Sequence, residues 1–116
     1  MKIAFFGTPA FTTSFLSKLL NEGLAPSLVV TNPDRPSGRG MILQSPEPKI
    51  WAEKNNIKVI QPEKLSDEVF EELSKEFWDL FVVVAYGKII PERFINLPKY
   101  GTINVHYSLL PKYRGA

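Results

Sequence analysis

Cysteine is absent from the 116 residues of this chain. Its absence excludes disulfide bonds and metal sites built from thiolates, and it agrees with a reducing compartment. The sequence also lacks an apolar run of membrane-spanning length, and its first residues lack the pattern of a secretory signal. We therefore expect a cytoplasmic protein that does not cross a membrane.

Histidine and net charge are also scarce. His106 is the only histidine, and the formal net charge of +2 is too small to indicate nucleic-acid binding by itself. Acidic residues crowd between positions 67 and 76, where a solvated helix face explains them better than a metal site, so we expect no metal. With 44% hydrophobic residues, the composition is that of one globular domain or of a piece of a larger one.

Short apolar runs alternate along the chain with segments of helical spacing. The runs are continuous, as in parallel strands that are buried on both faces. We predict strands at residues 2–6, 28–31, 57–60, 80–85 and 102–105. We predict helices at residues 10–21, 49–55 and 66–77, with Ser66 as a cap, Phe77 on the apolar face and a helical turn at 91–95. This order predicts an α/β fold with a Rossmann-like, mostly parallel open sheet that stops after its fifth strand.

The first strand is followed by Gly7, Thr8 and Pro9, where a dinucleotide site would need three glycines. Gly7 stands alone, and Pro9 removes a backbone N–H where the second glycine should be. We therefore interpret the segment as a tight connection, with Thr8 as the helix cap and Pro9 as the first helical residue.

Residues 32–48 are rich in proline and glycine, and we predict an irregular loop there. Arg35 and Arg39 lie within it, close to glycines that let a backbone approach a ligand. Arginine binds phosphate well because its planar fork offers two donors to two oxygens. Contact with phosphate or nucleic acid and a plain solvated loop both remain open for this segment.

Two polar residues end the last predicted strand, which we expect beside the end of the strand before it. Asn104 and His106 stand two residues apart, so they leave the same face of a strand. A neutral imidazole can take up or give back a proton, and an amide can donate a hydrogen bond to a developing oxyanion. Because Ser108 lacks the strained elbow of an esterase nucleophile, the pair indicates direct acyl transfer. A hydrogen-bonded interior histidine is the alternative.

Four segments together resemble the folate-dependent formyltransferases. Residues 104–115 resemble the signature of that family, and residues 85–91 resemble the stretch upstream of it. The Gly-Thr-Pro-Ala-Phe segment at 7–11 and the Asp-Arg-Pro-x-Gly-Arg-Gly pattern within 32–40 are similar to the branch that acts on initiator tRNA. The likeness runs in order along essentially the whole chain.

The resemblance implies transfer of a formyl group from 10-formyltetrahydrofolate to the amino group of methionine on initiator methionyl-tRNA, without a metal. It implies that Asn104 and His106 are catalytic and that Arg35 and Arg39 meet the tRNA. The implied folate-binding residues are Gly87, Lys88, Ile89, Ile90, Ser108, Leu109, Leu110 and Pro111.

The family's third catalytic residue, an aspartate, would lie beyond residue 116. Residues 1–116 are therefore expected to be the N-terminal part of the catalytic domain, inactive alone. The rest of that domain and a C-terminal β-barrel that binds tRNA would be absent, and the complete enzyme would be a monomer. Two alternatives stay open. One is a formyltransferase for a sugar nucleotide or glycinamide ribonucleotide, and the other is a non-catalytic module that binds folate or RNA.

Overall fold

Five parallel strands form the central sheet, in the order β5-β2-β1-β6-β7. The computed structural model describes residues 1–106. The strands are β1 (Ile3–Gly7), β2 (Leu28–Val30), β5 (Lys58–Ile60), β6 (Leu80–Val84) and β7 (Thr102–Val105). Every neighbouring pair is parallel. The predicted α/β class and mostly parallel open sheet are therefore confirmed.

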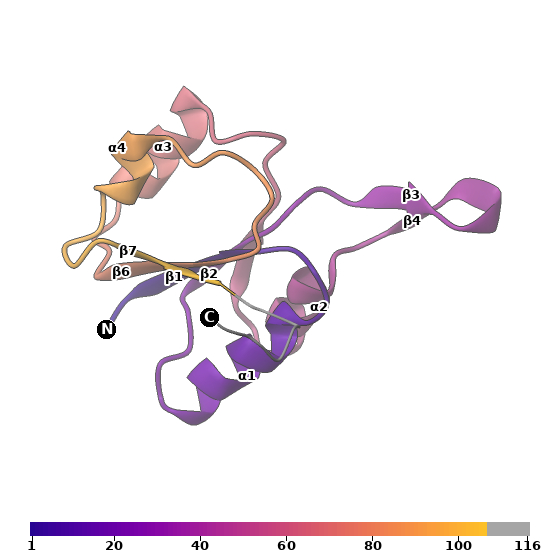
Figure 1. Ribbon diagram of the computed structural model, residues 1–116, viewed down its shortest axis with the longest axis horizontal. Coiled ribbons are helices and arrows are strands. Elements are labelled where there is room, and N and C mark those ends of the chain that lie inside the picture. The colour runs from indigo at the N-terminus through magenta and orange to yellow at the C-terminus, as the bar shows by residue number, and fades with distance from the viewer. Residues whose placement is uncertain (107–116) are drawn as a thin grey trace, which may run out of the picture.

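Helices cover both faces of this sheet. One face packs against α1 (Thr12–Asn21) and α2 (Glu47–Lys54), and the other packs against α3 (Asp67–Ser74) and α4 (Glu92–Ile95) (Figure 1). Because side chains alternate along a strand, β1 sends Phe5 into the core beneath α1 and Phe6 into the core beneath α3. Both phenylalanines are 0% exposed, which explains why the run has no polar position.

The strand β6 is buried on both faces, as its unbroken apolar sequence predicts. Phe81 and Val83 join the core on the α3 side, and Val82 and Val84 join the core on the α1 side. Its neighbour β7 forms the edge of the described sheet, where Ile103 is 50% exposed. Of the helices in residues 1–106, none combines the length and apolar character needed to cross a membrane.

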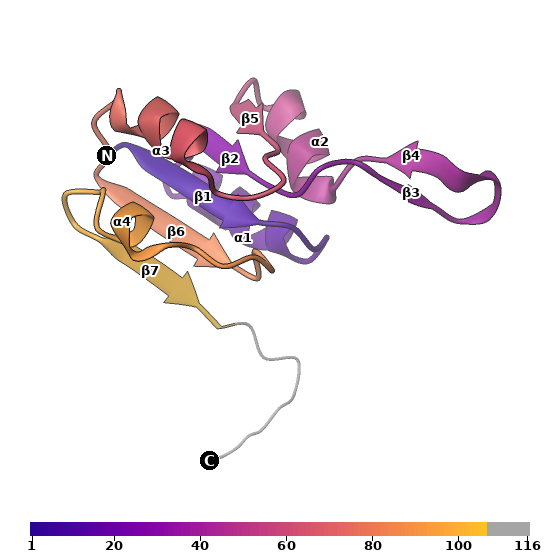
Figure 2. The same ribbon diagram turned by 90° about the horizontal axis from the view of Figure 1, so that it is seen from above.

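The prediction of an irregular loop over residues 32–48 is wrong in part. Two short strands, β3 (Arg35–Ser37) and β4 (Ile42–Gln44), pair antiparallel, and a 3-10 turn, η1 (Arg39–Met41), joins them. We call residues 35–44 the arm, which extends away from the sheet (Figure 2). A two-stranded ribbon has no central strand, so it tolerates a proline, which lacks the N–H of other residues. Pro48 lies in the first turn of α2, where that N–H is not needed.

Two helix boundaries also differ from prediction. Phe11, not Thr8, precedes α1, because the Thr8 hydroxyl donates instead to the Tyr86 carbonyl oxygen at 3.2 Å. Ser66 does cap α3, accepting from the Val69 amide at 3.4 Å. The helix ends at Ser74, however, and Phe77 is 61% exposed, so its predicted place on the apolar face is wrong.

Candidate active site

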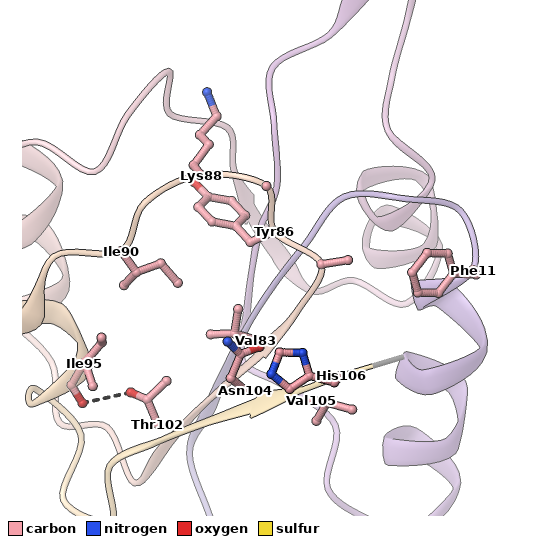
Figure 3. A pocket seen from close by; sticks show the side chains of 12 residues that line it. Phe11, Val83, Tyr86, Lys88, Ile90, Ile95, Thr102, Asn104, Val105 and His106 are labelled. Atoms are coloured by element: carbon pink, nitrogen blue, oxygen red, sulfur yellow. Dashed lines mark hydrogen bonds between the residues drawn. The ribbon is translucent and has the colours of Figure 1, made fainter. Parts of the chain in front are cut away.

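A cavity of about 530 Å³ lies at the carboxyl ends of β6 and β7 (Figure 3). Open parallel sheets bind their ligands at this edge, and the volume is that of a small-molecule site. The lining residues come from β6 and the turn after it, from α4, from β7 with the residue that follows it, and from the residue before α1: Phe11, Val83, Ala85, Tyr86, Gly87, Lys88, Ile90, Ile95, Thr102, Asn104, Val105 and His106.

Asn104 and His106 enter the cavity from one edge. Asn104 is directly opposite Val83 in the β6–β7 register, and His106 follows the last residue of β7. Both residues are exposed, and within residues 1–106 neither side chain has a hydrogen-bonding partner. Figure 3 shows the two side chains as neighbours among the residues that line the cavity. Among the described residues, both polar groups are therefore open to a ligand in the cavity.

The turn after β6 forms the opposite wall. Ala85 has a φ of 52° and Gly87 a φ of +84°, so the backbone reverses within three residues. A side chain at position 87 would be strained at this φ, which accounts for the glycine. The Thr8 bond to the Tyr86 carbonyl ties the turn to the end of β1, and the Lys88 ammonium donates to the Glu63 carbonyl oxygen. The wall is therefore held from two sides.

Tyr86 lies beneath this wall and is 2% exposed. Its ring packs edge-on against Phe6, with the ring centroids 5.6 Å apart. Its hydroxyl is buried and has no hydrogen-bonding partner among the described residues. Burial raises the pKa of Tyr86 to about 12, because a phenolate would be poorly solvated there. Tyr86 is thus a neutral floor of the cavity.

The structure brings five of the predicted site residues together. Gly87, Lys88 and Ile90 line the same cavity as Asn104 and His106. Ile89 points away, since it is 89% exposed and is not among the lining residues. The predicted positions Ser108, Leu109, Leu110 and Pro111 lie outside the described residues.

Sequence reasoning missed several lining residues. Thr102 stands two positions before Asn104, so the period of the strand could have placed it on the same face. Its hydroxyl donates to the Ile95 carbonyl oxygen at 2.8 Å, which brings α4 to the cavity (Figure 3). The local sequence does not predict that Phe11 lines the cavity, because its position depends on how α1 packs across the sheet.

The predicted arginines belong to the arm and not to the cavity. Arg35 begins β3 and is exposed, with its guanidinium 3.4 Å from the Glu63 carboxylate. Arg39 is the first residue of η1. Near the tip, Met41, Ile42 and Leu43 are each at least 65% exposed. Residues 35–46 contain no acid, so the arm is cationic and apolar at once.

Within residues 1–106, no cluster of three histidine or acidic side chains could hold a metal ion. The polar side chains that line the described part of the cavity include the Asn104 amide, the His106 imidazole, the Lys88 ammonium and the Thr102 hydroxyl.

Comparisons with known proteins converge on one family. A sequence profile described as formyl transferase matches residues 1–116. A curated relative from Sulfurihydrogenibium sp., named methionyl-tRNA formyltransferase, is 51% identical over 118 residues. A relative of the same name from Halalkalibacterium halodurans is 50% identical over 116 residues. These alignments take in 100% and 99% of this chain but only 38% and 37% of the relatives.

Proposed function

This chain belongs to the formyl transferase family, and from that membership we propose that the protein formylates initiator methionyl-tRNA with 10-formyltetrahydrofolate as donor. One observation carries the proposal. Asn104 and His106 are both exposed in a cavity of about 530 Å³ whose other wall is a backbone turn. The name shared by relatives that are about half identical to this chain supports tRNA as the acceptor.

In this mechanism Asn104 and His106 divide the work. His106 takes a proton from the methionine amine as its nitrogen attacks the formyl carbon. Asn104 donates a hydrogen bond to the formyl oxygen as negative charge develops there. The bond from the formyl carbon to the donor nitrogen then breaks, and that nitrogen receives the proton. We also propose that a carboxylate outside residues 1–106 orients the imidazole, as the family resemblance implies.

The folate would occupy the remainder of the cavity. Backbone groups of the turn at Gly87, Lys88 and Ile89 can bond the polar edge of a pterin, and Ile90 can contact its flat face. Because the Ile89 side chain is 89% exposed, its contribution would come from the backbone. In this proposal residues 108–111 complete the folate site.

The arm would bind the tRNA. Arg35 and Arg39 offer guanidinium groups that suit phosphate oxygens, and no acid in residues 35–46 opposes them. In a charged tRNA the reacting amine is a small part of a large polyanion. A pocket that reacts with the amine and a separate basic arm that binds phosphates suit such a substrate.

An acceptor comparison tests the proposal. The complete enzyme, and not residues 1–116 alone, is supplied with 10-formyltetrahydrofolate and, separately, with charged initiator tRNA, an amino-sugar nucleotide or glycinamide ribonucleotide. We expect transfer to the methionine of the tRNA and none to the small acceptors. Transfer to a small acceptor alone would replace this function with the corresponding formyltransferase activity. Folate binding without transfer to any acceptor would indicate a non-catalytic module.

A further inference from the structure

The direction of the arm is fixed only at its base. Among the described arm side chains, Arg35 alone makes a hydrogen bond or ion pair with the rest of the domain, and both it and its partner Glu63 are exposed. Pairs of this kind contribute little to stability. A two-stranded ribbon is itself marginal in water. The contacts that fix the direction of the arm must therefore lie where its two strands leave the domain.

Asp34 occupies that place, directly before β3. Its carboxylate accepts a hydrogen bond from the Gln61 amide at 2.7 Å and lies 3.3 Å from the Lys49 ammonium. Lys49 belongs to α2, which follows the returning strand β4, and Gln61 follows β5. The same Gln61 amide nitrogen donates to the Asn32 carbonyl oxygen at 3.0 Å. Gln61, which follows β5, thus holds the chain where it enters the arm, and Asp34 connects this point through Lys49 to α2, which follows the returning strand.

The segment from Gln61 to Glu63 also reaches the cavity. The Glu63 carbonyl oxygen accepts from the Lys88 ammonium, and Lys88 lines the cavity wall. Three residues therefore connect the base of the arm to the wall of the pocket. The side chains of Asp34 and Lys49 are 31% and 22% exposed, so water competes only in part for these bonds. The Gln61 hydrogen bond, with Lys49 beside it, holds the pKa of Asp34 below its usual value.

We propose that Asp34 and Gln61 are positioning residues, which hold the arm at a fixed direction relative to the pocket so that a bound tRNA presents its amine to Asn104 and His106. This inference rests on the proposed function. A reaction between two bound partners is sensitive to misplacement of either one by about 1 Å. An arm free to swing at its base would be in the direction that binds the tRNA for only part of the time, and its apparent affinity for the tRNA would fall by that fraction.

Exchanging the hydrogen-bond donor of Gln61 with the acceptor of Asp34 tests the role of this pair. Gln61→Glu keeps the size of the side chain but removes both N–H donors and places a second carboxylate against Asp34. We expect the KM for charged tRNA to rise about tenfold, which is the scale of one lost hydrogen bond to a charged group. The KM for the formyl donor should not change. The double variant Asp34→Asn with Gln61→Glu restores one donor and one carboxylate, and it should recover most of the loss.

Matched variants separate positioning from folding. Glu72→Gln, on α3, alters an exposed ion pair with Lys75, the residue that follows this helix, at 3.7 Å, and should leave both KM values unchanged. Gln61→Met removes the donors without adding charge, so it should also raise the tRNA KM. It replaces Gln61→Glu in the test if that variant fails to fold. Recovery in the double variant is the result that a general folding defect would not give.

Spin labels measure the direction of the arm without any turnover. Residues 1–116 contain no cysteine, so Lys18→Cys on α1 and Met41→Cys near the tip give two labels at exposed positions within this chain. The distance distribution between them should broaden in Gln61→Glu and narrow again in the double variant. An unchanged distribution together with an unchanged tRNA KM would overturn the inference, and so would a failure of the double variant to recover. Absence of formyl transfer by the unaltered complete enzyme would overturn the proposed function instead.

Discussion

The β1–β6 pair and the arm are both built from neighbouring strands, but they place their apolar side chains in opposite surroundings. Phe5 and Phe81 in the sheet are 0% exposed, whereas Ile42 and Leu43 in the arm are 67% and 65% exposed. In the sheet each apolar residue contacts a helix, and burial stabilises the fold. The arm leaves comparable residues exposed, which fits the proposal that it binds a partner.

Truncation of one large side chain in each region tests this contrast most strongly. Phe6→Ala should lower the free energy of unfolding by about 3–5 kcal/mol, because it leaves a cavity against Phe81 and Tyr86. Leu43→Ala should change it by less than about 0.5 kcal/mol. Urea denaturation followed by tryptophan fluorescence or circular dichroism measures both values. A loss of several kcal/mol in Leu43→Ala would mean that the arm belongs to the core, and the contrast would fail.

The dependence of stability on alkaline pH tests whether the Tyr86 hydroxyl at the pocket floor is buried. The ordinary tyrosine pKa is 10.0, and burial raises that of Tyr86 to about 12. Between these values the unfolded chain releases the proton while the folded chain keeps it, so stability falls as pH rises from about 10 to about 12, by about 2–3 kcal/mol. Tyr86→Phe should lack this component and should be as stable as the parent at pH 7. Equal alkaline losses in both proteins would show that the Tyr86 hydroxyl is not buried in solution.

A single added methyl group tests how closely β1 and β6 pack at Gly7 and Val84. A Cβ added at Gly7 would lie 2.6 Å from the Val84 carbonyl oxygen, which is backbone and cannot turn aside. Gly7→Ala should therefore destabilise the protein by about 1–3 kcal/mol. Gly38→Ala in the arm is the control for added volume, since nothing lies within 4 Å of its Cβ, although its φ of +68° adds local strain. A Gly7→Ala protein of parental stability would show that β1 and β6 can separate at their ends.

Burial explains which parts of the fold could be predicted. The strand at Leu80–Val84 was predictable because a strand covered on both faces needs apolar residues at every position. The arm was not, because proline and glycine exclude helices and central strands but permit a short exposed ribbon. Thr8 was misassigned as a cap for a related reason. Its hydroxyl bonds to Tyr86, a residue 78 positions away, and no local pattern indicates that contact.

In the candidate site, too, the sequence predicts what a local pattern decides and not what depends on distant contacts. Asn104 and His106 were predictable as neighbours because the period of a strand fixes their common face. The cavity itself depends on the parallel pairing of β6 with β7 and on the turn at Gly87. Asp34 and Gln61 could not be paired from the sequence, since they meet only after β2 and β5 have paired in the sheet.

The central claim is that the pocket performs the chemistry and the arm binds the tRNA. Steady-state kinetics on charged initiator tRNA test it most directly, with Asn104→Ala compared against the double variant Arg35→Ala with Arg39→Ala. Asn104→Ala should lower kcat by about 10²–10³ with little change in the tRNA KM. The arginine variant should raise the tRNA KM about tenfold or more, with kcat and the donor KM unchanged. A fall in kcat for the arginine variant at saturating tRNA, or an undiminished kcat for Asn104→Ala, would contradict the account.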